Sequence, residues 1–328
     1  MNLSNISKQR FGFSKFLVIF ALLFAFSGMS HAAKYKIGVS VPSADHGWTA
    51  GLLWWANKAV DEIGAKEKDV EFFVVAASSG TKQVGDVEDL MIKGINALVI
   101  LPHNPATLQK VIEEAFSSGI YTVVVDRELA VPAQHVFIAG DNPGLGRVGG
   151  EWLADEMKGK GNVVVIEGMQ IPINKQRVDA FNDVIAKHPG IKVLDSQPAD
   201  WSTQKALAVM ENFLQKHPSI DAVWCQDDDM LKGVMQAIKE SGRTEIKTVL
   251  GGAGSKDIIK MIMEDNPVVR ATVTYNPSMV ASGVALAVAG VKGETVGNLY
   301  HTPSRVIIGA DLVVKGNADS YYYPTAAF

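Results

Sequence analysis

The sequence is poor in cysteine, since Cys225 is the only one among its 328 residues. One cysteine can form neither an internal disulfide, nor a cysteine-based zinc site, nor a redox pair. The count fits an exported bacterial protein that does without disulfides, although it does not establish export.

An excess of positive charge is also missing. Lys and Arg number 31 against 35 Asp and Glu, which gives a formal net charge of −4. That balance offers no electrostatic footprint for a nucleic-acid backbone, so we expect no nucleic-acid partner. Charged residues make up only 20% of the chain, which argues against disorder. Hydrophobic residues make up 47%, enough to fill a sizeable core. The length suggests about two domains.

The N-terminus lacks an apolar run of membrane-spanning length, because its uninterrupted stretch, residues 16–26, has only 11 residues. As a helix it rises about 16 Å, roughly half the hydrocarbon core. Basic residues precede it and small residues follow it, which indicates a secretory signal peptide rather than a membrane anchor. We expect cleavage after Ala32, no lipid anchor, and a soluble mature protein in the periplasm. Loss of Lys8, Arg10 and Lys15 would leave 28 − 35 = −7.

From Tyr35 onward, short β-branched runs alternate with amphipathic stretches. Some runs are apolar throughout, as at residues 163–166, which is typical of parallel strands covered by helices on both faces. About ten such runs predict an α/β protein with two doubly wound parallel sheets, and a change of lobe near residues 140–143. The expected strands are 35–41, 70–76, 97–101, 121–125, 136–139, 162–167, 192–194, 222–225, 248–251 and 269–274. The expected helices include 48–63, 84–93, 106–117, 179–187, 203–216 and 230–240.

Ligands of open parallel sheets bind beyond the carboxyl ends of the strands. The residues that follow the expected strands are rich in hydrogen-bonding and aromatic side chains, which suit a polyhydroxylated ligand. A carboxylate accepts from neighbouring hydroxyls, a guanidinium donates to two oxygens, and an indole covers the apolar face of a sugar. The candidate ligand-binding residues are Asp45, His46, Trp48, His103, Asp126, Arg127, Gln170, Arg177, Trp201, Asp227 and Tyr275.

Trp48 and Trp201 each lie at an expected strand-to-helix turn, one in each half of the chain. We therefore expect them to contact opposite faces of one ring. The remaining tryptophans lie inside helical or strand patterns, and we expect these in the core: Trp54, Trp55, Trp152 and Trp224.

Five motifs in register carry a resemblance to a known family: Ser40 with residues 45–48, then 126–127, 177–181, 196–201 and 226–228. They resemble the ribose-binding protein family, the periplasmic substrate-binding components of sugar ABC importers, over essentially the whole mature chain. The resemblance implies the type I fold, in which two lobes are joined by a three-segment hinge and one sugar is enclosed in the cleft between them. Besides the signal peptide expected over 1–32, we expect an N-terminal lobe from 33–140 plus 276–304, and a C-terminal lobe from 141–275 plus 305–328.

By this resemblance the N-terminal lobe contributes Trp48, Asp126 and Arg127, with Asp45 or His46 in place of a family asparagine. The other lobe would contribute Arg177, Trp201, Asp227 and Tyr275, the last where ribose binders carry glutamine.

The sequence departs from the family at Ala253, which stands where an aspartate usually precedes a glycine. A site that loses a hydroxyl acceptor discriminates against ligands that need it. We therefore expect a ligand other than ribopyranose, such as another pentose, a hexose or a linear sugar alcohol.

Several motifs suggest other chemistry but are weak. Residues 144–149 match GxGxxG, yet Pro143 precedes them and export disfavours a dinucleotide, so we assign these glycines to close helix packing. The run 227–229 has no spaced oxygen-ligand loop; we expect one aspartate to accept from the ligand and another to cap a helix. We expect neither a metal nor another cofactor.

Three functions remain open at this point. The favoured one is a monomeric binding protein that delivers a monosaccharide or sugar alcohol to the permease of an ABC importer. A ligand-sensing partner of a membrane sensor kinase or chemoreceptor would use the same fold and site. An enzyme is disfavoured because nothing assembles a nucleophile with its base, and the DNA-binding relatives of lactose-repressor type carry a helix-turn-helix where this chain has its export signal.

Overall fold

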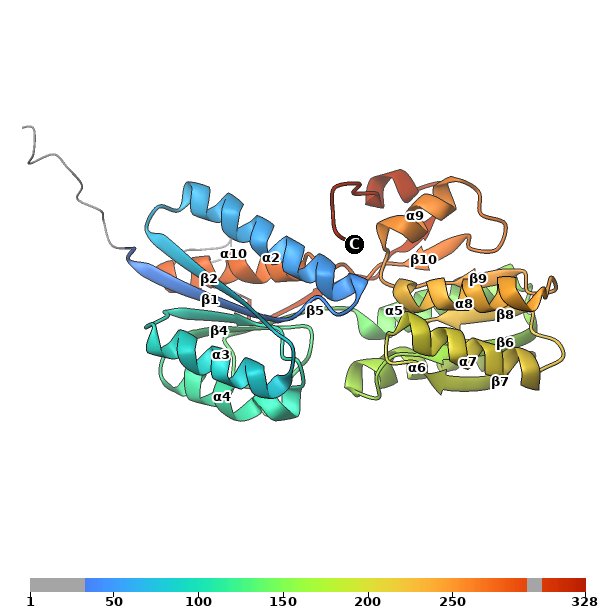
Figure 1. Cartoon of the computed structure of the whole chain (residues 1–328), viewed down its shortest axis with the longest axis horizontal. Coiled ribbons are helices and arrows are strands. Elements are labelled where there is room, and N and C mark those ends of the chain that lie inside the picture. Colours follow the sequence, from blue (N-terminus) through green and yellow to red (C-terminus); the bar gives the residue numbers. More distant parts are fainter. Residues whose placement is uncertain (1–32, 294–302) are drawn as a thin grey trace, which may run out of the picture.

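The computed structural model of the protein describes residues 33–293 and 303–328, so the expected signal peptide lies outside the described residues. Two lobes lie side by side along the long axis of the molecule (Figure 1). In the described part of the chain, no helix combines the length and the apolar character needed to cross a membrane.

The first lobe is built on a six-stranded sheet of order β2-β1-β3-β4-β5-β11, in which every recorded pairing is parallel. Its strands are β1 (Tyr35–Pro42), β2 (Val70–Ala77), β3 (Ala97–Ile100), β4 (Tyr121–Val125), β5 (Val136–Gly140) and β11 (Arg305–Ile308). Its helices are α2 (Gly47–Lys66), α3 (Gly80–Ile92), α4 (Pro105–Ser117) and α10 (Met279–Lys292).

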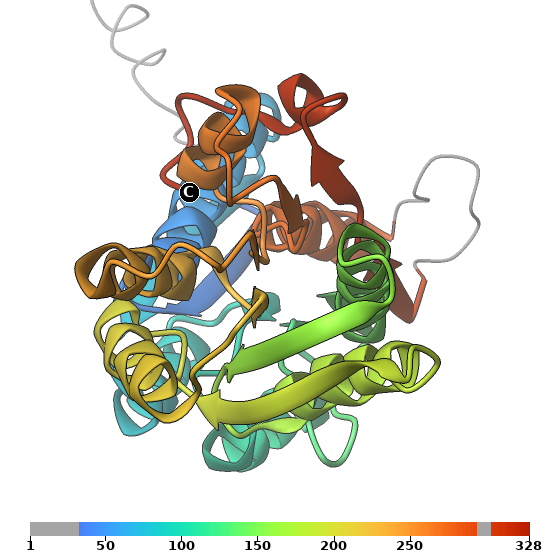
Figure 2. The ribbon, with the colours of Figure 1, turned by 90° about the vertical axis from the view of Figure 1, so that its right-hand side faces the viewer.

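The second lobe repeats this plan with a sheet of order β7-β6-β8-β9-β10-β12, whose last strand runs antiparallel to β10. In Figure 2 this lobe faces the viewer. Its strands are β6 (Lys160–Glu167), β7 (Gly190–Pro198), β8 (Ala222–Cys225), β9 (Thr248–Leu250), β10 (Ala271–Val273) and β12 (Leu312–Val314). Its helices are α5 (Asn142–Glu156), α6 (Pro172–Ile185), α7 (Thr203–Lys216), α8 (Asp228–Ser241), α9 (Lys256–Met263) and the 3-10 turn η1 (Ala318–Tyr321).

Side-chain alternation along each strand explains why helices cover both faces of the sheets. In the first lobe, Ile37 and Val39 pack in one cluster with α2 and α10. Leu98 and Ile100 point to the other face and pack with α3 and α4. Apolar residues at both parities require cover on both sides, so the predicted fold of two doubly wound α/β lobes is confirmed.

The chain passes between the sheets three times, at residues 140–142, 273–279 and 308–312. The last boundary, predicted between residues 304 and 305, is wrong. Residues 305–308 form β11, which pairs with β5 of the first sheet, so the crossing comes after Ile308. Four residues of a partly exposed edge strand carry too little pattern to be assigned to a lobe.

Strand β7 and helix α6 are among the elements that are longer than the sequence predicted. Strand β7 continues to Pro198, so Asp195, Ser196 and Gln197 belong to an edge strand, where polar side chains are tolerated. Helix α6 begins at Pro172 rather than at residue 179, because proline suits the first helical position. Helix α10 was not predicted, since its nearly uniform apolar sequence shows no period.

Candidate functional site

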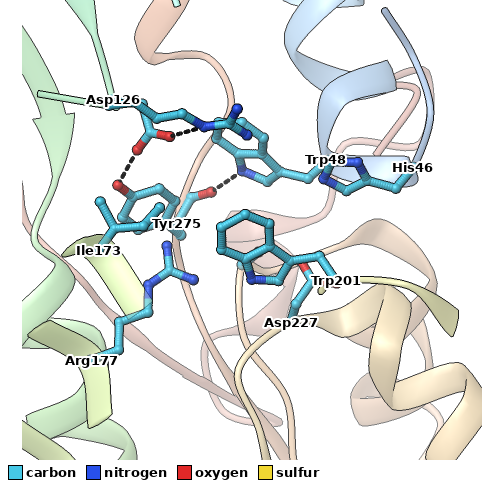
Figure 3. A pocket seen from close by; sticks show the side chains of 10 residues that line it. His46, Trp48, Asp126, Ile173, Arg177, Trp201, Asp227 and Tyr275 are labelled. Carbon is cyan, nitrogen blue, oxygen red and sulfur yellow. Dashed lines mark hydrogen bonds and ion pairs between the residues drawn. The ribbon is translucent and has the colours of Figure 1, made fainter. Parts of the chain in front are cut away.

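A small cavity lies between the lobes, at the carboxyl ends of strands from both sheets (Figure 3). Ten residues line it: His46, Trp48, Asp126, Arg127, Ile173, Arg177, Trp201, Asp227, Ala253 and Tyr275.

Eight of the eleven residues selected from the sequence line this cavity, and Asp45, His103 and Gln170 do not. The Asp45 carboxylate is exposed and accepts from Thr49 Oγ1 at 2.8 Å, and its bond to His46 holds the pKa of Asp45 well below its ordinary value. His103 contributes its backbone oxygen, which accepts from Arg127. Gln170 is exposed and donates to Glu167 Oε2 at 3.1 Å. Each follows a strand, as expected, but none of the three lines the cavity.

Sequence reasoning missed Ile173 and did not place Ala253 among the contacts. Ile173 is buried in the first turn of α6, behind Pro172, where the strand was expected to give way to a loop. Ala253 was noted only as a missing aspartate. The structure places it in the cavity wall.

The two indoles reach the cavity from different lobes. Trp48 lies in the first turn of α2, and its Nε1 donates to the backbone oxygen of Tyr275 at 2.8 Å. Trp201 follows β7, and it packs so closely on Gly168 that a Cβ there would lie 2.2 Å from Trp201 Nε1. Both indoles are 6% exposed. As expected for a core residue, Trp224 is fully buried, whereas Trp54 is only half-buried.

Asp126 and Arg127 are buried at the end of β4, not paired at the surface. Arg127 Nη1 donates to the backbone oxygens of Pro102, at 3.2 Å, and His103. Arg127 Nε lies 3.8 Å from Asp126 Oδ2 and has no hydrogen-bond partner among the described residues. Burial lowers the pKa of Arg127, against the opposing charge of Asp126. A buried donor without a partner is suited to a ligand oxygen.

Tyr275 connects the lining residues of both lobes. Its hydroxyl donates to Asp126 Oδ1 and accepts from Asn142 Nδ2 at 3.0 Å. Asn142 Oδ1 in turn accepts from Arg177 Nε at 2.8 Å, and the Arg177 guanidinium lies 4.4 Å from the centre of the Tyr275 ring. Burial raises the pKa of Tyr275, and the charge of Asp126 adds to the shift. The phenol is therefore occupied within the protein, and the ring forms the wall.

The three consecutive aspartates have different partners. Asp227 caps α8, as expected of one of them, by accepting from Asp229 N and Met230 N, and it also lines the cavity. Burial raises the pKa of Asp227, and the negative charge of Asp229 adds to this. Asp228 is fully buried and accepts from Gly252 N, Ser255 N and Thr272 Oγ1. Asp229 contacts the other lobe.

The glycines of the GxGxxG match serve packing, as expected. A Cβ on Gly146 would lie 2.1 Å from the backbone oxygen of Arg177, so this glycine lets α5 approach α6.

Backbone strain concentrates at the cavity. Six non-glycine residues in the described part of the chain have positive φ, and three of them, Asp126, Trp201 and Ala253, line it. Each costs on the order of 1 kcal/mol, and such strain clusters at functional sites.

Two lobes that enclose aromatic faces, guanidinium donors and carboxyl acceptors define a binding protein for a small polar ligand. The comparisons identify the class further. The family described as "Periplasmic binding protein domain" matches residues 37–295, so the chain belongs to that family. This confirms the resemblance drawn from the five motifs. The family is one of periplasmic binding proteins, which places the chain in the periplasm and among binding proteins.

Individual relatives share less than a third of the sequence over most of its length. The D-allose-binding periplasmic protein of Escherichia coli is 31% identical over 80% of this chain and 88% of its own. The ribose import binding protein RbsB of Bacillus subtilis is 29% identical over 77% of this chain and 80% of its own. An ABC transporter solute-binding protein from Mycobacterium smegmatis, solved with bound glycerol, is 29% identical with a TM-score of 0.78, and the match covers 89% of this chain and 98% of that one.

Proposed function

We propose that this protein captures a monosaccharide or sugar alcohol in the periplasm and delivers it to the permease of an ABC importer. One observation carries the proposal: the cavity is lined from both lobes by two indoles, two guanidinium groups and two aspartates. The printed names of the relatives, which include ribose- and allose-binding proteins, support the same ligand class.

In the proposed mechanism the lobes close on the ligand. Trp48 and Trp201 cover the apolar faces of the ligand, Arg127 and Arg177 donate to its oxygens, and Asp126 and Asp227 accept from its hydroxyls. These groups lie on both lobes, so their contacts coexist only in the closed form, and the ligand shifts the population toward that form. The proposed role is binding without chemical change of the ligand, by a monomer that needs no cofactor.

We further propose that the preferred ligand is not ribopyranose. Ala253 offers no acceptor to a hydroxyl at its wall, and the Tyr275 hydroxyl is already bonded to Asp126 and Asn142. A ligand that presents a C–H group to Ala253 loses nothing, whereas one that presents a hydroxyl leaves it unpaired.

Calorimetric titration of the purified mature protein against monosaccharides and polyols tests this function. We expect at least one to bind with a micromolar or tighter Kd, and ribose to bind more weakly. Absence of binding across the panel would contradict the ligand class, and a clear preference for ribose would contradict the assignment of Ala253. Uptake by the reconstituted permease then tests delivery, and tight binding without uptake would favour the signalling role.

A further inference from the structure

Asp229 of the second lobe lies against the beginning of α2 in the first lobe. Its Oδ2 accepts a hydrogen bond from the backbone N–H of Trp48 at 3.2 Å. Gly47 packs on the same carboxylate, since a Cβ placed on Gly47 would lie 2.5–2.9 Å from three of its atoms. The Asp229 side chain is only 8% exposed. Two residues 181 positions apart thus meet across the gap between the lobes.

The electrostatics favour this contact. The first turn of α2 contains no acidic residue, and Asp229 itself lies in the first turn of α8. The N-terminus of a helix carries a positive partial charge, so a carboxylate between two such ends stabilises both. Within the second lobe, Lys232 Nζ donates to the other oxygen of this carboxylate, Asp229 Oδ1, at 3.4 Å.

The carboxylate of this contact lies outside the cavity lining, although the indole of its partner Trp48 is part of that lining. Asp229 and Gly47 are not among the residues that line the cavity, although each is close in sequence to residues that do. A hydrogen bond between Asp229 and Trp48 requires the lobes to be together, but it requires no ligand.

We propose that Asp229 and Gly47 form a closure contact that sets the fraction of the protein in the closed form, and thereby scales the affinity for every ligand by the same factor. The inference rests on the proposed function, in which the closed form binds. When only one conformation binds, the apparent Kd is the intrinsic Kd divided by the fraction in that conformation. Loss of a residue that touches the ligand would instead change the order of preference among sugars.

The test uses Asp229→Ala, Gly47→Ala and the double variant of the mature protein. We expect each single variant to weaken the affinity for the three tightest ligands about tenfold, the loss of one charge-assisted hydrogen bond. The ratios between ligands should stay unchanged. The double variant should be no weaker than Asp229→Ala, because the added methyl group then meets no carboxylate.

Two matched controls are available in the chain. Asp257 shares Lys232 with Asp229 but is 62% exposed, so Asp257→Ala should bind like the parent protein. Gly85 lies in α3 with nothing within 4 Å of an added Cβ, so Gly85→Ala should also bind normally. Thermal unfolding identifies any variant that is poorly folded. Asp229→Asn, which keeps the shape and one acceptor, should then give an intermediate loss.

Measuring the distance between the lobes tests this inference independently of which ligand the protein binds. Spin labels on cysteines introduced at Ile92 and Glu240, both exposed, report it, while the native Cys225 is fully buried. We expect ligand-free Asp229→Ala to populate longer distances than the parent protein. Unchanged distances, losses that differ between sugars, or additive losses in the double variant would each overturn the closure contact. If no sugar binds at all, the proposed ligand class is wrong, and the ligand-free distances still decide the role of Asp229.

Discussion

Replacement of Tyr275 by phenylalanine removes one oxygen atom from the centre of the network that joins the lobes. The ring remains against Gly140, where a Cβ would lie 2.3 Å from it, and under the Arg177 guanidinium. The variant therefore isolates the two hydrogen bonds of the hydroxyl, one to Asp126 and one from Asn142.

The magnitude follows from these two bonds. A hydrogen bond to a charged acceptor contributes about 1.5–3 kcal/mol and a neutral one about 1 kcal/mol. Because Asp126 is 3% exposed, water cannot readily replace the lost donor. We expect Tyr275→Phe to lower the free energy of unfolding by about 2.5–4 kcal/mol. At roughly 2 °C per kcal/mol for a chain of this length, the Tm should fall by about 5–8 °C.

Affinity should fall as well. Asp126 and Arg177 both line the cavity and are both held through Tyr275, so the variant loses the fixed orientation of two proposed ligand contacts. We expect the Kd of the tightest ligand to rise about tenfold or more.

Urea denaturation, calorimetric melting and isothermal titration measure these effects. Tyr323→Phe is the control, because that side chain is 50% exposed and its hydroxyl can be solvated. A change in unfolding free energy below about 0.5 kcal/mol would show that the hydroxyl is replaceable and would refute the reasoning. So would a stability loss accompanied by unaltered affinity, because the network would then not orient the cavity.

Three further predictions concern single side chains. Ala253 has a left-handed backbone with φ of +83°, which glycine adopts without strain. Ala253→Gly should therefore raise the free energy of unfolding, measured by urea denaturation, by up to about 1 kcal/mol. A lower free energy of unfolding would contradict the claim that this backbone is strained. Trp201→Ala should weaken sugar binding by about 2 kcal/mol, roughly thirtyfold by titration, whereas Trp54→Ala on the outer side of α2 should not; equal effects would disprove the aromatic contact. The hydrogen bond from Lys216 lowers the pKa of Asp195 to about 2, so its stabilisation is present above about pH 4 and is lost as the pH falls toward 2. Asp195→Asn should cost at most about 1 kcal/mol at pH 7, because Lys216 is largely solvated, and nothing once the pH is well below 2; a constant difference across pH would exclude the ion pair.

The order of elements and most of the cavity could be predicted because parallel strands impose a simple geometry. A residue that follows a buried strand must lie at the carboxyl edge of the sheet, which is why Asp126, Arg127 and Asp227 were found. The same rule gives no direction for a side chain. It therefore selected His103 and Gln170, which share that edge but do not line the cavity.

Other features depend on how the two lobes sit against each other, which local sequence does not encode. Nothing near Trp48 indicates that its backbone N–H meets Asp229. Nothing near Tyr275 indicates that its hydroxyl would be taken up by Asp126 and Asn142. Such contacts join residues more than a hundred positions apart, and they appear only once both sheets are built.

The late position of β11 and α10 in the chain has a consequence for how the first lobe folds. The first sheet lacks its β11 edge, and its core lacks α10, until nearly all of the second lobe has been synthesised. Residues such as Met279 and Val284 are fully buried in that early core, yet they are made late. We therefore expect the first lobe to complete its native core only after most of the second lobe has been synthesised.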